Sequence, residues 1–310
     1  MVVSLTSSEG HYDGVQKALR SIEKAIVEKL EEAKTIMIKP NFVSSYRELS
    51  ATPVESVKAL LDFIYSNIGE REIVIAEGVT IGSFDVALKN YDYLKLKNSY
   101  NIRFVNLNTD NFAVFKVYDR SLKKNVKVRV AKTALESDFK ISICRPKTHD
   151  TVVVTLSIKN LVMGAIQLPY KRNMHQGYGP INLNIALMAR YLMPELAIID
   201  GYVGMEGSGP VGGDPVRWKV ALAGVNPLEV DALTAWLMGF SPLEVGYIYL
   251  LHEGGWGNID IDRIETVGEE PARFRRKFRP HPTYHEQLRW MDMKEILVKI
   301  FKKELIQGTS

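Results

Sequence analysis

Cysteine is almost absent from this chain of 310 residues, which contains only Cys144. A single thiol forms no disulfide within the chain, and an iron–sulfur cluster held by the chain needs about four thiolates. We therefore expect no iron–sulfur cluster. Such sparing use of cysteine is typical of proteins in the reducing cytoplasm, which is the location we expect.

Long hydrophobic runs are missing as well. No stretch approaches the roughly 18 consecutive apolar residues that a membrane-spanning helix requires. The first ten residues, M-V-V-S-L-T-S-S-E-G, lack the basic and apolar regions of a signal peptide. The sequence therefore predicts no membrane span and no export signal.

The chain has no strong charge of either sign except near its end. The net charge is +4, and residues 271–310 hold ten Lys or Arg against four Asp or Glu, so the preceding 270 residues sum to −2. General nucleic-acid binding by this first part is not expected. We divide the chain into an α/β body, 1–270, in which any two lobes would enclose a cleft, and a basic tail, 271–310.

Strand-like and helix-like segments alternate along the first two-thirds of the chain. This alternation predicts an α/β fold with a mostly parallel sheet and flanking helices. Strands clustered within 102–143 predict an antiparallel insertion or a second lobe. Strands are predicted at 2–5, 35–38, 73–76, 102–105, 112–117, 126–130, 139–144, 196–199 and 216–223, and helices at 15–30, from 52 onward, at 155–163, at 181–192 and from 226 onward.

Three helix starts have the same local pattern of capping residue, proline and glutamate. They are Thr52-Pro53-Val54-Glu55, Asn226-Pro227-Leu228-Glu229 and Ser241-Pro242-Leu243-Glu244. We expect Thr52, Asn226 and Ser241 to cap these helices through their side chains.

Polar residues fall where predicted strands end. Lys39 and Asn41 follow the strand at 35–38, Glu77 follows 73–76, Lys147 and His149 follow 139–144, and Asp200 follows 196–199. In α/β sheets, ligands bind outside the carboxyl ends of the strands. Lysines delivered to that edge indicate a site for a small anionic molecule.

A second polar cluster, Lys159 and Asn160, lies in an apolar helical segment. Lys159 is the only charged residue between 152 and 166. A lone charge in such a segment is usually paired or functional. His175 follows in residues 165–180, which show no clear period and which we expect to be a long functional loop.

The glycine-rich segment 206–213 contains a formal G-x-G-x-x-G that begins at Gly207 and continues with Gly209. A dinucleotide site needs a helix to begin within that motif. Pro210 interrupts it and a strand follows, and no Walker-type phosphate loop is present. A lid or a nest of backbone N–H groups for an anion fits better, beside a purely structural turn.

The catalytic roles follow from these positions. We expect Lys39, Lys147 and Lys159 to bind the anion and His149 to be the general acid or base. The orienting carboxylate or second acid is Glu77, Asp200 or Asp231. The remaining candidate substrate-binding residues are Asn41, Asn160, His175, Gly207 and Gly209.

Purely structural roles for these residues remain alternatives to the functional ones. His149 can be a structural histidine, Lys147 a surface charge and Asp231 a partner of a helix dipole. A divalent metal held by His149, His175 and nearby carboxylates is also open, although no H-E-x-x-H spacing supports it.

The basic tail combines arginines with aromatic residues in R-F-R-R-K-F-R-P at 273–280. Such a stretch can bind RNA, acidic lipid or an acidic partner. Beyond it, apolar residues at helical spacing predict an amphipathic helix docked on the body or on a second subunit, which would make a homo-oligomer. These residues are Trp290, Met293, Leu297, Ile300 and Phe301.

The same motifs resemble those of the family named domain of unknown function 362. The matching pieces, in one order over about 35–257, are K-P-N (39–41), T-P-V-E (52–55), Glu77-Gly78, P-K-T-H (146–149), T-L-S-I-K-N-L-V-M-G (155–164), His175, I-I-D-G (198–201), E-G-S-G-P-V-G-G (206–213) and N-P-L-E-V-D-A (226–232). The resemblance implies an α/β body with a polar cleft and specifies no reaction. Many relatives carry a ferredoxin-like iron–sulfur segment, and this chain, with its single cysteine, is a variant without one.

Two functional hypotheses follow from the sequence. The first is a cytoplasmic enzyme that acts on a small carboxylate or phosphate in a cleft lined by lysine, histidine and acids. The alternative is a non-enzymatic module that binds a ligand or metal and docks an acidic partner or RNA through its tail.

Overall fold

The computed structural model describes residues 2–307 and contains one large central sheet. Eight strands lie in the order β12-β1-β11-β10-β7-β2-β3-β4, and β8 and β9 attach beside β10. The strands are β1 (Val3–Ser7), β2 (Ile36–Lys39), β3 (Ile73–Glu77), β4 (Ile102–Asn106), β7 (Phe139–Cys144), β8 (Lys147–Thr148), β9 (Val154–Thr155), β10 (Leu196–Glu206), β11 (Asp214–Gly224) and β12 (Thr266–Gly268).

Parallel pairing dominates the half of the sheet that carries the polar strand ends. Strands β10, β7, β2, β3 and β4 pair parallel to one another, whereas β11 pairs antiparallel with both β10 and β1. The predicted α/β fold with a mostly parallel sheet is therefore confirmed. The parallel strands bring the ends of β2, β3 and β7 to one edge.

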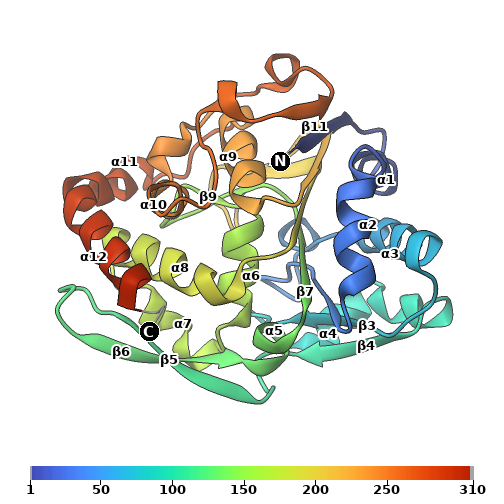
Figure 1. Cartoon of the computed structure of the whole chain (residues 1–310), viewed down its shortest axis with the longest axis horizontal. Helices are drawn as coiled ribbons and strands as arrows, with labels where there is room; N and C mark the ends of the chain where they lie inside the picture. Colours follow the sequence, from blue (N-terminus) through green and yellow to red (C-terminus); the bar gives the residue numbers. More distant parts are fainter. Residues whose placement is uncertain (1, 308–310) are drawn as a thin grey trace.

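Helices cover both faces of this sheet (Figure 1). One face packs against α1 (His11–Arg20), α2 (Glu23–Glu32), α3 (Val54–Ile68) and α4 (Phe84–Asn90). The other packs against α6 (Ser157–Ala165), α8 (Tyr178–Leu192), α9 (Pro227–Leu237) and α10 (Gly246–Glu253). The remaining helices are α5 (Lys132–Glu136), α7 (Leu168–Met174), α11 (Tyr284–Gln287) and α12 (Lys294–Gln307), with 3₁₀ turns at Glu48–Ser50, Tyr93–Asn98, Pro242–Glu244, Ile261–Arg263, Pro271–Phe274 and Leu288–Met293.

Successive residues of the central strands alternate between the two cores. In β2, Ile36 and Ile38 belong to the core under α1–α3, and Met37 belongs to the core under α6 and α8. Neighbouring residues of a strand point to opposite faces. A strand covered on both faces is therefore apolar throughout, which explains its short β-branched run.

The predicted antiparallel insertion is present as a separate two-stranded sheet. It pairs β5 (Phe112–Tyr118) with β6 (Asn125–Ala131), whereas β4 joins the central sheet parallel to β3. The Asn184 side chain of α8 bonds both backbone groups of Tyr118, at 2.8 and 2.9 Å. These two bonds tie the small sheet to the body.

Three local predictions are wrong. The expected loop at 165–180 holds α7 and the start of α8, because Pro169 occupies the first turn of a helix, where its missing N–H costs nothing. The expected helix at 15–30 is two helices that meet near Ser21, whose hydroxyl bonds to Lys17 O. Asn226 caps α9 as expected, but Thr52 does not cap α3 and instead bonds to Asn41 N and Ile143 O.

The segment after residue 270 packs against the body of the same chain. Phe278, Trp290, Leu297 and Phe301 are buried, and Trp290 Nε1 donates to Glu244 O at 2.8 Å. The apolar stripe of α12 is thus covered within the chain. A homo-oligomer formed through this helix stays a prediction.

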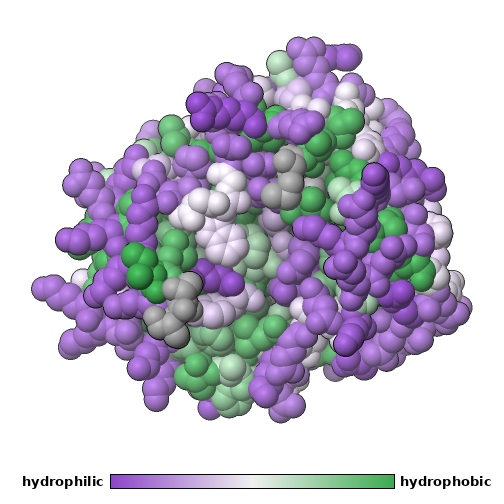
Figure 2. All heavy atoms as spheres, viewed as in Figure 1, coloured by the Kyte–Doolittle hydropathy of each residue, from purple (hydrophilic) through white to green (hydrophobic). Residues whose placement is uncertain are grey.

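None of the helices formed by residues 2–307 has the length and apolar character needed to cross a lipid bilayer. The face drawn in Figure 2 is mostly hydrophilic, with smaller hydrophobic patches between the polar side chains.

Candidate functional site

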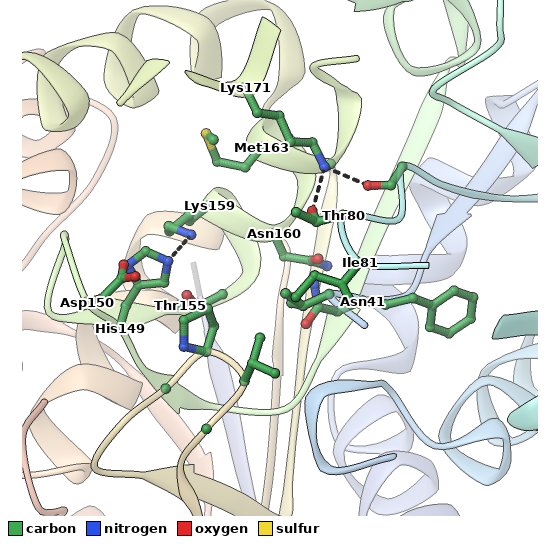
Figure 3. Close-up of a pocket in the computed structure, with 18 of the residues that line it drawn as sticks. Asn41, Thr80, Ile81, His149, Asp150, Thr155, Lys159, Asn160, Met163 and Lys171 are labelled. Atoms are coloured by element: carbon green, nitrogen blue, oxygen red, sulfur yellow. Dashed lines mark hydrogen bonds and ion pairs between the residues drawn. The ribbon is translucent and has the colours of Figure 1, made fainter. Parts of the chain in front are cut away.

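A pocket of about 400 Å³ lies at the ends of β2 and β3 and beside the segment that follows β7. Figure 3 shows side chains entering it from several elements. It is lined by Asn41, Phe42, Val43, Glu77, Gly78, Thr80, Ile81, His149, Asp150, Thr155, Lys159, Asn160, Met163, Gly164, Lys171, His175, Ser208, Gly209, Pro210, Val211, Gly212 and His281.

The floor of the pocket is a closed network around Lys39 and Glu77. Lys39 Nζ donates to Glu77 Oε2 at 2.7 Å, Asn160 Oδ1 at 2.9 Å and Pro40 O at 2.8 Å. Glu77 also accepts the backbone N–H groups of Phe42 and Gly78. Burial lowers the pKa of Lys39, and the Glu77 carboxylate opposes that shift. Both side chains are satisfied by the protein itself.

Two glycines allow this floor to form. A Cβ on Gly164 would lie 1.8 Å from Lys39 Cε, and a Cβ on Gly78 would lie 2.4 Å from Gly164 O. No real side chain tolerates such contacts. The glycines of E-G and N-L-V-M-G therefore let α6 approach the end of β3 closely enough for Asn160 to meet Lys39.

Lys147 lies behind the pocket and does not line it. It is fully buried and donates to Asn41 Oδ1 and to Ser50 O. Burial lowers its pKa to about 7. Lys147 thus orients Asn41, which does line the pocket.

The wall of the pocket carries two lysines with few partners. Lys159 Nζ contacts His149 Nε2 at 3.0 Å, and Lys171 Nζ donates to Gly78 O at 2.6 Å and Thr80 Oγ1 at 3.0 Å. Within residues 2–307 neither lysine forms an ion pair with a carboxylate. Burial lowers the pKa of each to about 8.

His149 is buried and held on several sides. Its Nδ1 accepts the Thr151 backbone N–H at 3.0 Å, with Thr151 Oγ1 and Asp150 Oδ1 also 3.0 Å away. Burial, together with the charge of Lys159, lowers its pKa to about 3, so the ring is neutral near pH 7.

Thr155, in β9, carries a buried hydroxyl that lines the pocket. Among the described residues its Oγ1 has no hydrogen-bond partner. Buried hydroxyls are nearly always bonded, so this atom is an unused donor and acceptor inside the pocket.

The glycine-rich segment lies over the mouth of the pocket as the turn between β10 and β11. Gly209 lines the pocket, whereas Gly207 anchors the turn: its carbonyl accepts from Thr148 Oγ1 and its N–H donates to Arg279 O. His175 is exposed at the same mouth.

Asp200 and Asp231 lie away from the pocket, which corrects their expected convergence. Strand β10 continues past Asp200 to Glu206, and Asp200 faces α1 and α3, where it accepts from Ser56 Oγ at 2.5 Å and contacts His11 Nδ1 at 2.7 Å. Asp231 accepts the backbone N–H groups of Ser157 and Ile158 and so caps α6 from α9. Burial raises its pKa to about 7.

The C-terminal segment contributes to the site, which the sequence did not indicate. His281 lines the pocket. The buried Gln287 donates to His149 O at 2.7 Å and accepts from Val153 N at 2.5 Å. It therefore clamps the turn that carries His149, in which Val153 has a φ of +66°.

Sequence reasoning also missed Lys171, Asp150, Thr80 and Thr155 as lining residues. Pro169, in the first turn of α7, was a local signal for the helix that carries Lys171. His281, by contrast, lies far along the chain from the other lining residues and reaches the pocket through tertiary packing. Among residues 2–307 no group of three His, Cys, Asp or Glu side chains is arranged to hold a metal ion.

These features define an α/β protein with a pocket of lysines and histidines at the carboxyl edge of its parallel strands. The family model described as domain of unknown function (DUF362) matches residues 36–236, which is more than half of the chain. The protein belongs to this family, and His281 and Gln287 lie beyond the matched residues.

Individual relatives are distant. A thylakoid-associated protein of Synechocystis sp. is 24% identical over 216 residues, which are 68% of this chain and 64% of that protein. The chain thus spans somewhat less than two thirds of the relative's length. The lactate racemase apoprotein of Thermoanaerobacterium thermosaccharolyticum has a TM-score of 0.46 at 16% identity (72% of this chain, 54% of that one), and a Thermotoga maritima protein has 0.41 at 14% (68% and 55%).

Proposed function

We propose that the protein is an enzyme that acts on a small anionic substrate, a carboxylate or a phosphate, bound in this pocket. Thr155 is the observation that supports the proposal most strongly. Its buried hydroxyl faces a cavity and lacks a partner among residues 2–307. A ligand oxygen in the pocket would supply the missing hydrogen bond.

Charge supports the choice of an anion. Lys171 uses two of its three N–H donors on neutral oxygens, and no carboxylate of the described chain pairs with it. Hydrogen bonds between an ammonium and an anion are stronger than those between neutral groups. Lys171 and Thr155 therefore hold the anionic group of the substrate in the proposed complex.

The reacting end of the substrate lies beside Lys159 and His149. We assign His149 the role of general acid or base, because it lines the pocket beside Lys159. The turn at 208–212 and His281 cover the mouth and limit the entry of water.

The other candidates become positioning residues in this proposal. Lys39, Glu77 and Asn160 build the floor, and Lys147 orients Asn41. Asp231 holds the start of α6, which carries Lys159, and Asp200 ties β10 to α1 and α3. Lys39 and Glu77 pair with each other at 2.7 Å, so neither presents an unpaired charge to the pocket.

A second function is favoured by one observation on the C-terminal segment. Arg273, Arg275, Arg276 and Lys277 are exposed together, while Phe278 beside them is buried. Such a cluster suits an acidic partner or RNA. In this alternative the protein is a ligand-binding module that docks through the cluster.

The proposal places the protein in the cytoplasm, because a chain with one buried cysteine suits a reducing compartment.

A thermal-shift screen tests the proposed function. The purified protein is heated with phosphates, nucleotides, small carboxylates or divalent metals. A ligand at about 100 times its Kd stabilises the folded state by roughly 2.7 kcal/mol, which is easily measured. We expect stabilisation by one anion class, clearly reduced in Thr155→Val and Lys171→Met. Stabilisation that is unchanged in both variants would contradict the assigned pocket.

A further inference from the structure

Lys159 and His149 form a pair of nitrogen atoms in the pocket wall. Lys159 Nζ lies 3.0 Å from His149 Nε2, the contact drawn as a dashed line in Figure 3. Two nitrogens at this distance share one hydrogen, so one donates and the other accepts. The direction of that bond decides whether Lys159 is an ammonium ion or a neutral amine.

The other ring nitrogen of His149 sets the direction. Its Nδ1 accepts the backbone N–H of Thr151, a group that can only donate and whose hydrogen position the chain fixes. Nδ1 therefore carries the lone pair, and the hydrogen of the neutral ring is on Nε2. An ammonium has no lone pair to accept it. The contact is a hydrogen bond only when Lys159 is a neutral amine.

The charged groups around the pair act on this arrangement in both directions. Asp150 Oδ1, 3.0 Å from Nδ1, would favour a hydrogen on that nitrogen, but the Asp150 side chain is 50% exposed, which weakens this interaction. Burial lowers the pKa of Lys159 to about 8; the charge of Asp150 opposes this shift, and the charges of Lys171 and Lys39 add to it. The backbone N–H of Thr151 therefore sets the tautomer of His149, with the hydrogen of the ring on Nε2.

We propose that Lys159 is a nucleophilic amine that forms an imine with the carbonyl carbon of a small 2-oxo carboxylate. The inference rests on the proposed anion site and narrows its substrate. A desolvated lysine amine attacks carbonyl carbons. Lys171 and Thr155, on the same pocket, bind a carboxylate next to that carbonyl. The volume of about 400 Å³ suits a molecule of metabolite size.

The atoms of the step balance without a further reagent. Lys159 Nζ attacks the carbonyl carbon, and one hydrogen of the nitrogen passes to the carbonyl oxygen. The resulting hydroxyl leaves as water with the second hydrogen of the nitrogen. The products are a carbon–nitrogen double bond and one water, so nothing is oxidised or reduced.

Reductive trapping tests the proposal on the unmodified full chain. The protein is incubated with glyoxylate, pyruvate or 2-oxoglutarate and sodium cyanoborohydride, and peptide mapping locates each adduct. The expected adduct adds the mass of the acid less one oxygen atom. We expect it on Lys159 at least tenfold above the level on Lys24, a surface lysine that is 92% exposed.

The variants are chosen to preserve the fold or the charge. Lys159→Met and Lys159→Arg should both lose the trapped adduct at that position, and melting curves show that each is folded. Adducts spread over surface lysines, with Lys159 at or below the level of Lys24 for all three acids, would overturn the imine.

The trapping result is separable from the proposed function. Stabilisation by pyruvate and by lactate, its 2-hydroxy counterpart, without trapping at Lys159 would overturn the imine and leave the anion site intact. The absence of stabilisation by any anion would instead count against the proposed function itself.

Discussion

The floor and the wall of the pocket each contain a buried lysine, and the two lysines have opposite roles. In the floor, buried Lys39 donates three hydrogen bonds, one of them to Glu77, which is itself satisfied by Phe42 N and Gly78 N. In the wall, Lys159 is almost as buried, with 6% of its surface exposed, and its Nζ contacts a neutral histidine, His149. Burial alone therefore does not separate a structural lysine from a reactive one.

The separating feature is the partner. A buried ammonium is tolerated when a carboxylate and other oxygens replace water. Without them, the charged form is disfavoured and the amine becomes available for chemistry. The floor thus holds the ends of β2 and β3 and helix α6 together, and the wall is free to meet a ligand. Four predictions test this contrast, from the largest expected effect to the smallest.

Glu77→Ala should cause the largest effect. The change leaves Lys39 buried without its carboxylate, which costs about 3–5 kcal/mol of unfolding free energy. Urea denaturation measures the loss. The control is Lys39→Met with Glu77→Gln, which removes both charges and should recover part of the stability. If Glu77→Ala is as stable as the unmodified protein, the Lys39–Glu77 pair does not stabilise the fold, and the contrast between floor and wall is wrong.

Gln287→Ala should weaken the wall and leave the floor intact. The variant loses both hydrogen bonds to the His149 turn and leaves two buried backbone groups unsatisfied, at a cost of about 2–3 kcal/mol. Anion affinity should fall as well, because His149 and Lys159 lose their fixed geometry. A variant that melts earlier but binds the anion as before would show that the C-terminal segment is not part of the site.

Lys171→Met should weaken anion binding about tenfold, or about 1.4 kcal/mol, because one charged hydrogen bond to the ligand is lost. Titration calorimetry with the anion found by screening gives the affinity. The matched control is Lys147→Met, which changes a buried lysine that does not line the pocket. A larger loss in Lys147→Met than in Lys171→Met would restore Lys147 as the anion ligand.

Lys159→Met should raise the unfolding free energy near pH 7, because burial disfavours the ammonium form of Lys159 there. The folded pKa of Lys159 is about 8, below its ordinary value of 10.5, so the folded state binds fewer protons between these values. The unfolding free energy of the unmodified protein therefore rises from about pH 8 to 10.5. Denaturation curves over this range should show a smaller rise in Lys159→Met, and an identical rise would mean that Lys159 titrates normally.

Much of the fold was predictable because the sheet is covered on both faces. Apolar runs such as 36–38, 73–76 and 139–144 must be strands in that environment, and their alternation with helices indicates a parallel sheet. The helix break near Ser21 and the helix at 168–174 were missed. Both depend on short-range hydrogen bonds and packing that apolar spacing does not report.

The site was predictable only where it follows strand ends directly. Asn41, Glu77 and His149 reach the pocket because β2, β3 and β7 are parallel neighbours. Asp200 follows the same rule in the sequence but lies inside a longer strand and faces the opposite core. His281 and Gln287 arrive through tertiary packing over more than 100 residues, for which the sequence carries no local signal.

Trace reductive methylation with formaldehyde measures the contrast between floor and wall most directly. The full-length protein is labelled at pH 7 to a low extent, and peptide mapping gives the rate at each lysine. Formaldehyde is small and uncharged, so the rate reports the accessible neutral amine. The account predicts that Lys159 reacts faster than the exposed Lys24, that a bound anion protects it, and that Lys39 stays unlabelled. A rate at Lys159 as low as that at Lys39 would contradict it.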